Sequence, residues 1–166
     1  MQFNVSLLLR EPVGATRNVV LEAEPPVLGG EAQLTHTPGA VLVHVRADVV
    51  LDASCSRCLA PFGYAAGIDF EESFYQQVDV ATGTRLPAPE EPDAFLISLT
   101  HTIDITEAVR QYSEMAAEMQ PLCRPDCPGI CPVCGQDLGI ATCQCDRTVT
   151  DPRWAPLAAL KSAQNG

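Results

Sequence analysis

The chain has 166 residues, of which 46% are apolar, so it is long enough and apolar enough for one core domain with a small appendage. Its formal net charge is -11 and its pI is near 4.5. Phosphate backbones repel such an acidic chain unless its few basic residues cluster, which argues against a broad nucleic-acid-binding surface.

The sequence has no charged N-terminal segment followed by an apolar stretch, and no apolar run long enough to span a bilayer. We therefore expect a cytoplasmic protein without a membrane partner. Thiols stay reduced in the cytoplasm, so the eight cysteines favour metal binding over disulfides.

Two β-hairpins are expected in the N-terminal part of the chain. Alternation followed by an apolar run predicts a strand over residues 3–9, which should pair with a strand over 18–23. Pro38-Gly39 is a turn signal between strands at 32–37 and 41–51. The alternating valines of the last strand place His44 on its polar face, where a solvated residue is favoured over a ligand.

The strand at 41–51 leads into Cys55-Ser-Arg-Cys58, and residues 62–75 return as an extended, aromatic-rich arm. The pair should therefore lie at the tip of an antiparallel hairpin, where a tight turn can direct both sulfurs to one metal. A thioredoxin-like redox couple has the same spacing, but there the motif opens a helix. Pro61 and the glycines after it argue against a helix here.

Residues 77–94 are rich in proline and acids, and predict a solvated loop before a short strand at 95–99. A helix is expected near 104–119, capped by Thr102 or Asp104 and ended by Pro121. Its apolar stripe should pack on the sheet; this stripe consists of Val109, Tyr112, Met115 and Ala116.

Six of the eight cysteines lie between residues 123 and 145, in a stretch broken by proline and glycine that has too few apolar residues for a core of its own. Structural zinc is held by four ligands in a closed tetrahedron, so eight cysteines fit two all-thiolate Zn²⁺ sites. We assign one site to Cys131, Cys134, Cys143 and Cys145. We assign the other to Cys55, Cys58, Cys123 and Cys127.

Other pairings and another metal stay open at this point. Cys123, Cys127, Cys131 and Cys134 could share one ion, and iron also accepts tetrahedral sulfur. No catalytic residue is predicted, because a catalytic zinc keeps an open position with a mixed ligand set, and no histidine lies near the cysteines. A terminal helix over 151–161, with Pro152 in its first turn and Trp154 on one face, is expected to dock on the domain.

These elements predict an α+β protein: an antiparallel sheet or partly closed β-barrel with one covering helix and a cysteine-rich, zinc-bound C-terminal segment. We expect an antiparallel β domain with its helix over residues 1–120, and the zinc-binding segment with the terminal helix over 121–166.

The chain also resembles a known family. The features that carry the resemblance are Cys55-Ser-Arg-Cys58-Leu, the run Pro-Leu-Cys-x-x-x-Cys-x-Gly-Ile-Cys-Pro-x-Cys-Gly over 121–135, the Cys143-x-Cys145 pair and Asp151-Pro-Arg-Trp154. Together they are similar to the YceD family, named for accumulation of large-subunit ribosomal RNA. The resemblance implies a non-enzymatic role in ribosome biogenesis and ribosomal RNA accumulation, without a small-molecule substrate.

The acidity of the chain predicts basic partners, such as large-subunit ribosomal proteins or assembly intermediates. Direct RNA contact is the alternative, through a small basic face formed if the metal sites bring scattered cations together. The candidate partner-contact residues are Arg57, Arg124, Arg147, Arg153 and Trp154. Two other functions stay open: a redox protein that uses Cys55 and Cys58, and a zinc-bound interaction module in another assembly.

Overall fold

The computed structural model describes residues 1–146 and Arg153. Contacts divide the chain into two compact units. The first comprises Met1–Ala53 and Phe62–Met119, and the second comprises Ser54–Pro61 and Gln120–Gly166. The expected domain boundary at residue 120 stays a prediction, because compact units need not fold independently.

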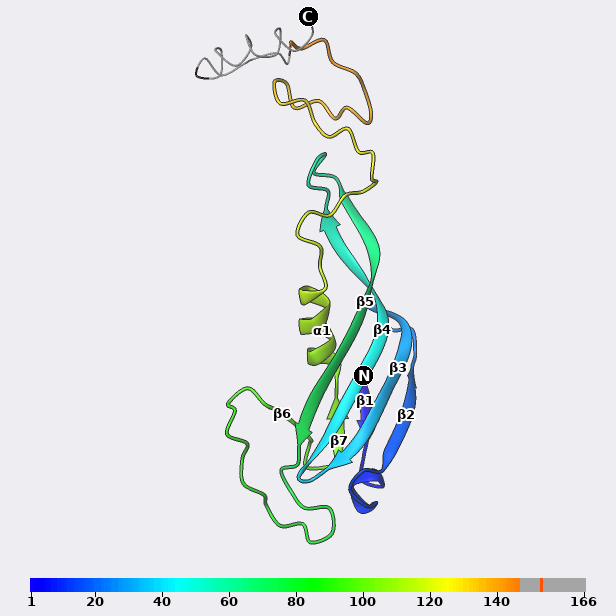
Figure 1. Ribbon diagram of the computed structural model, residues 1–166, viewed down its shortest axis with the longest axis vertical. Coiled ribbons are helices and arrows are strands. Elements are labelled where there is room, and N and C mark those ends of the chain that lie inside the picture. The colour runs from blue at the N-terminus through cyan, green and yellow to red at the C-terminus, as the bar shows by residue number, and fades with distance from the viewer. Residues whose placement is uncertain (147–152, 154–166) are drawn as a thin grey trace, which may run out of the picture. The chain divides into compact units, whose positions relative to one another are not determined.

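A five-stranded sheet is the main element of the first unit (Figure 1). Its strands, in spatial order, are β2 (Thr16–Leu21), β3 (Val27–Thr37), β4 (Ala40–Ser54), β5 (Pro61–Tyr75) and β6 (Phe95–Leu96). The β2–β3 and β3–β4 pairs are antiparallel, whereas β6 runs parallel to β5. β2 and β6 are the two edges, so the sheet is not closed into a barrel.

The β3–β4 hairpin confirms the prediction from Pro38-Gly39. Gly39 has φ +78°, a conformation that glycine adopts without strain, and the first paired residues beside the turn are Thr37 and Ala40. The predicted alternation holds, since the inward valines of β4 are fully buried while His44 lies on the outer face, 2.7 Å from Asp69.

The N-terminal hairpin was predicted wrongly. Only Gln2–Asn4 form a strand, β1, which pairs antiparallel with β7 (Thr102–Asp104) and not with β2. The leucines that follow enter a 3-10 turn, Leu8–Arg10, in which Leu8 and Leu9 are both buried. Consecutive apolar residues can both be buried in a turn, whereas an edge strand would expose every second one.

The helix α1 (Thr106–Met115) is shorter than predicted at both ends. β7 occupies residues 102–104, and the Asp104 carboxylate accepts a hydrogen bond from the Thr106 N–H at 3.0 Å. At the other end the helix stops well before Pro121. Tyr112 packs on the core as predicted, stacking on Phe70 with ring centroids 4.1 Å apart, but Met115 is 76% exposed and does not.

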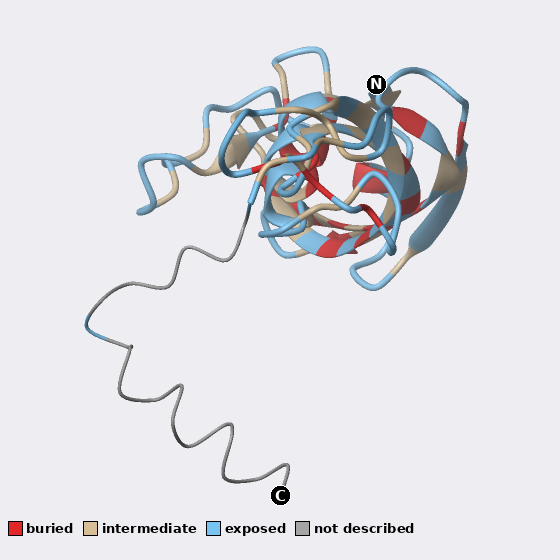
Figure 2. Cartoon of the chain, turned by 90° about the horizontal axis from the view of Figure 1, so that it is seen from above, coloured by how far each residue is buried: buried red, intermediate tan, exposed pale blue. Residues whose placement is uncertain are grey.

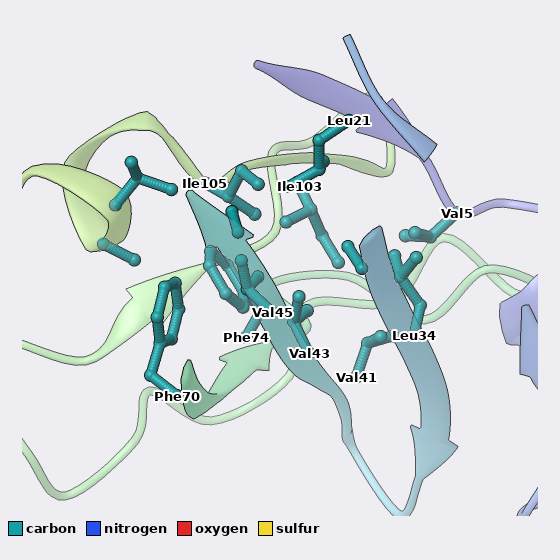
Figure 3. Close-up of a cluster of buried hydrophobic side chains, with 14 of the residues drawn as sticks. Val5, Leu21, Leu34, Val41, Val43, Val45, Phe70, Phe74, Ile103 and Ile105 are labelled. Atoms are coloured by element: carbon teal, nitrogen blue, oxygen red, sulfur yellow. The ribbon is translucent and has the colours of Figure 1, made fainter. Parts of the chain in front are cut away.

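One apolar core joins these elements (Figure 3). The inward side chains of β3, β4 and β5 pack in one cluster with those of the β1–β7 pair and of α1. Figure 2 colours the buried residues of the chain red. The strand expected at 95–99 is reduced to β6, although Ile97 beyond it is buried. Apart from Arg153, the expected terminal helix at 151–161 lies outside the described residues. No helix in the described part of the chain is long and apolar enough to cross a membrane.

Candidate metal centres

The hairpin tip between β4 and β5 holds Cys55 and Cys58. The Cys55 N–H donates to the carbonyl of Ala60 at 2.9 Å, and the Leu59 N–H donates to the carbonyl of Cys55 at 2.9 Å. Leu59 adopts φ +61°, which is uncommon for a residue with a side chain. The tip is thus closed tightly enough to direct both sulfurs to the same side, as the sequence predicts.

Backbone and side-chain hydrogen bonds hold the segment of Cys123 and Cys127 against this tip. The Ser56 N–H donates to the carbonyl of Pro121 at 2.9 Å, and the Arg57 guanidinium donates to the carbonyl of Cys127 at 2.9 Å. The two chain segments are more than sixty residues apart in sequence, so tertiary contacts and not local spacing assemble this site.

Four sulfurs meet at this point, close enough together to hold one metal ion. The Sγ atoms of Cys55, Cys58, Cys123 and Cys127 all lie within 4.8 Å of one another. Two of the separations, from Cys55 to Cys127 and from Cys58 to Cys123, are 3.7 Å. A tetrahedron with zinc–sulfur bonds of about 2.3 Å has edges of about 3.8 Å, so the four ligands fit a single zinc ion.

The cysteines of this first tetrad differ in pKa. Backbone N–H groups, above all that of Cys123, stabilise the thiolate and lower the pKa of Cys55 to about 6. Desolvation and hydrogen bonds to Cys55 and Cys58 raise the pKa of Cys123 to about 12. The Cys55 sulfur is therefore ready to bind a cation at neutral pH, and Cys123 releases its proton when the cation arrives.

The second tetrad begins with Cys131-Pro-Val-Cys134-Gly. The Val133 N–H points at the Cys131 sulfur at 3.5 Å, and the Gly135 N–H donates to the carbonyl of Cys131 at 2.9 Å. Gly135 has φ +73°, so the residue after the second cysteine must adopt a conformation that favours glycine. This turn places the backbone amides around the first sulfur of the site.

Cys143 and Cys145 complete the second tetrad. The Sγ atoms of Cys131, Cys134, Cys143 and Cys145 lie within 4.8 Å of one another. Backbone N–H groups of Cys134 and Val133 lower the pKa of Cys131 to about 6, while a hydrogen bond to Cys134 and desolvation raise that of Cys145 to about 12. As in the first tetrad, one cysteine has a lowered pKa and another has a raised pKa.

A short backbone ladder lies between the two tetrads. The Ile130 N–H donates to the carbonyl of Arg57 at 3.2 Å, and the Leu138 N–H donates to the carbonyl of Gly129 at 2.9 Å. Gly129 has φ +76°, and a Cβ there would lie 3.1 Å from the Arg57 carbonyl oxygen. Glycine at position 129 therefore favours the close approach of the two segments, which the sequence did not predict.

The structure brings together the same two sets of four cysteines that the sequence reading paired. Within the described residues these are the two groups of three or more potential metal ligands. The alternative in which Cys123, Cys127, Cys131 and Cys134 share one ion does not fit this grouping. Each tetrad can hold a metal ion.

The cations proposed for partner contact have different surroundings. Arg57 is exposed but donates to the Cys127 carbonyl, so it helps to hold the first tetrad. Arg124 is exposed and forms an ion pair with Asp126 at 3.6 Å. Arg153 is exposed, whereas Arg147 and Trp154 lie outside the described residues.

Comparison with known proteins agrees with the resemblance noted from the sequence. The model of the family described as "Large ribosomal RNA subunit accumulation protein YceD" matches residues 43–161. The chain is also similar to uncharacterized proteins of Mycobacterium tuberculosis and Mycobacterium bovis, with 32% identity over 106 residues. The aligned part covers 64% of this chain and 48% of each relative, so the chain spans about half the length of these relatives.

No solved structure matches the chain. The family match extends from β4 through both tetrads, and so includes all eight cysteines and more than half of the chain. The description of the family supports a ribosome-related role. On this basis the chain belongs to the YceD family.

Proposed function

We propose that this protein is a non-enzymatic, zinc-binding factor in ribosome biogenesis that acts in the cytoplasm and promotes accumulation of large-subunit ribosomal RNA. Its two metal sites are structural. They hold the hairpin tip and the C-terminal segment in the conformation that a partner in ribosome assembly recognises.

The observation that carries this proposal is the pair of complete cysteine tetrads in a chain of the YceD family. Four thiolates fill the coordination sphere of zinc and leave no position for water or substrate, which is the arrangement of structural and not of catalytic zinc. Tetrahedral sulfur also suits iron, so the identity of the metal is part of the test.

The charge of the chain supports a protein partner over direct RNA contact. Lysine and arginine total 10 against 21 acidic residues, and RNA binding depends on clustered cations that release counterions from phosphate. Arg57 and Arg124, two of the candidate cations, already contact groups within the second unit. Basic large-subunit ribosomal proteins or assembly intermediates fit this acidic chain better.

The redox alternative has less support. A thiol–disulfide couple needs an accessible pair of cysteines without other thiols bound to the same site. The Sγ atoms of Cys55 and Cys58 instead lie 3.7 Å from those of Cys127 and Cys123, respectively. A metal bound by all four sulfurs occupies the thiolates that such chemistry uses.

Two measurements test the proposal. Elemental analysis of protein purified under reducing conditions should find two zinc ions per chain, and absence of metal would refute the structural-zinc part. Depletion of the protein in its own cell should lower large-subunit ribosomal RNA relative to small-subunit ribosomal RNA. The intact gene should restore the ratio, and a variant with Cys131→Ser and Cys134→Ser should not. An unchanged ratio on depletion contradicts the ribosomal role.

A further inference from the structure

One edge of the main sheet is open over part of its length. β6 pairs with β5 at two positions, Phe74 with Phe95 and Tyr75 with Leu96 (Figure 1). β5 itself extends back to Pro61, and no other strand in the described part of the chain pairs with this side of it. An unpaired strand edge presents N–H and C=O groups that a further strand can bind.

The direction of the backbone identifies which residues present these groups. The Tyr75 carbonyl accepts a hydrogen bond from the Ile97 N–H at 2.9 Å, so the backbone groups of Tyr75 point toward the β6 side. Residues along a strand alternate in the side to which their backbone groups point. Ser73 and Glu71 therefore direct theirs to the same side, at positions where β6 is absent.

An acidic hollow of about 540 Å³ lies beside this open edge. It is lined by β5 on one side, by the residues that lead into β6 on another, and by Gln111 of α1. Four carboxylates line it: Glu71, Glu72, Glu91 and Asp93. The described residues that line it include no lysine or arginine. The Glu71 side chain is 60% exposed, and Glu91 and Asp93 are exposed as well.

Charge and shape together select the occupant. The strand edge accepts an extended backbone, and the carboxylates attract lysine and arginine side chains while they repel phosphate. The same negative charges oppose pairing between two copies of this chain at that edge, because each copy would bring its own acids. The surface therefore suits a cationic polypeptide better than RNA or a second copy.

We propose that the open edge of β5 and the acidic hollow form a docking site for a basic, extended segment of a partner protein. The segment adds as a strand beside residues 71–73 and directs its cationic side chains toward Glu91 and Asp93. This inference rests on the proposed function and gives the partner its chemical class: a protein with a lysine- or arginine-rich extended segment.

Binding of synthetic peptides to the zinc-loaded, full-length protein tests the site directly. The probe is a fluorescently labelled peptide of about ten residues in which lysine alternates with threonine. We expect saturable binding that weakens as salt rises. A peptide of the same sequence with alternate backbone amides N-methylated should bind about tenfold more weakly, because it cannot complete the strand pairing. Equal binding of the two peptides would overturn the proposal.

Charge reversal on the protein tests the hollow. The double variant Glu91→Lys, Asp93→Lys should bind the lysine peptide about tenfold more weakly. The control is Glu22→Lys, Glu24→Lys, which changes the net charge equally at exposed positions outside the hollow and should alter binding less than about twofold. Equal weakening by both double variants means general attraction to an acidic protein and contradicts a specific site.

The same variants separate this inference from the proposed function. If depletion lowers large-subunit ribosomal RNA and the Glu91→Lys, Asp93→Lys variant restores it as well as the intact protein does, the docking site is refuted while the ribosomal role stands. If depletion has no effect but the peptide binds in the hollow, the ribosomal role fails instead. A single-stranded RNA that competes with the peptide for the hollow would also overturn the choice of a protein partner.

Discussion

The two units of this protein differ in the kind of residue that they bury. In the first unit the buried residues, apart from His36, Ala40 and Ser113, form one cluster of aliphatic and aromatic side chains. In the second unit the buried residues, within the part that the structure describes, are Cys55, Cys127, Gly129 and Cys131. Over residues 120–146 this unit has a single bridge, between Ile130 and Asp137, in place of helices or strands. The hydrophobic effect can stabilise the first unit, whereas under the proposed function ligand bonds to a metal stabilise the second.

Loss of the metal gives the largest expected effect and tests this contrast most directly. Cys131→Ser should reduce the zinc content from two ions to one, because three sulfurs do not complete the second tetrad. Structural zinc contributes on the order of 10 kcal/mol to the folding of a small metal-held segment, so amide hydrogen exchange should accelerate strongly between residues 129 and 145. The amides of β3 and β4 should keep their protection.

The control for this experiment is Val133→Ala, since Val133 lies in the same turn with 59% of its surface exposed. It should leave the zinc content at two. If Cys131→Ser accelerates amide hydrogen exchange in β3 and β4 as much as in the second unit, the first unit also depends on the metal and the contrast between the units is wrong.

A core truncation tests the opposite side of the comparison. Phe74 is 1% exposed and packs on Phe95 with ring centroids 5.1 Å apart, so Phe74→Ala should lower the free energy of unfolding by about 3 to 5 kcal/mol. Urea denaturation followed by circular dichroism measures the change, and the zinc content should stay at two. Val20→Ala, at a position that is 78% exposed, should change the free energy by less than about 0.5 kcal/mol. Zinc loss in the Phe74 variant would show that the core and the metal sites depend on each other.

A backbone substitution sharpens the comparison at one residue. A Cβ at position 135 would meet no atom within 4 Å, so the cost of Gly135→Ala comes from φ +73° alone. This substitution should destabilise the folded turn by about 1 to 2 kcal/mol. This corresponds to about five- to thirtyfold weaker zinc binding at the second tetrad, measured by competition with a chromogenic chelator. Gly83→Ala is a matched control in the first unit, with φ +69° and equally open space. Weakened zinc binding in the control would contradict a local effect.

The smallest expected effect concerns one hydrogen bond in the first unit. Tyr112→Phe keeps the stacking on Phe70 but loses the hydrogen bond that the hydroxyl donates to Glu72 at 2.7 Å, which should cost about 0.5 to 1 kcal/mol. Tyr75→Phe is the control, because no hydrogen bond of the Tyr75 hydroxyl occurs in the described structure. Equal losses of stability in the two variants would argue against a role of this bond.

The pH dependence of stability gives a second measurement on the same residue. The hydrogen bond to Glu72 and burial raise the pKa of Tyr112 above its ordinary value of 10.0. The folded state therefore holds this proton more tightly than the unfolded state does. Its stabilising contribution is complete below pH 10 or so and is lost as the pH rises through the folded-state pKa. The Tyr112→Phe variant has no titratable group at this position, so that part of the decrease should be absent.

Local patterns in the sequence predicted the parts of the fold that depend on neighbouring residues. The β3–β4 hairpin follows from Pro38-Gly39 and the alternating valines, because a tight turn fixes the register and the buried face follows. The pairing of β1 with β7 could not be found in this way, since nothing local specifies that residues about one hundred positions apart will meet. The turn at Leu8–Arg10 was also not predicted, because the burial of Leu8 and Leu9 depends on the elements that pack against them.

For the candidate metal centres, the sequence by itself predicted two sets of four cysteines as ligands, because sulfur chemistry and short spacings restrict what eight cysteines can do. The turn at Cys131-Pro-Val-Cys134-Gly is likewise local, with Gly135 at positive φ. Only the tertiary structure decided how Cys55 and Cys58 meet Cys123 and Cys127, and that glycine at position 129 favours close approach of the Arg57 carbonyl. The physical reason is that chain closure over such a distance costs entropy, which contacts spread over the whole fold compensate and no short motif encodes.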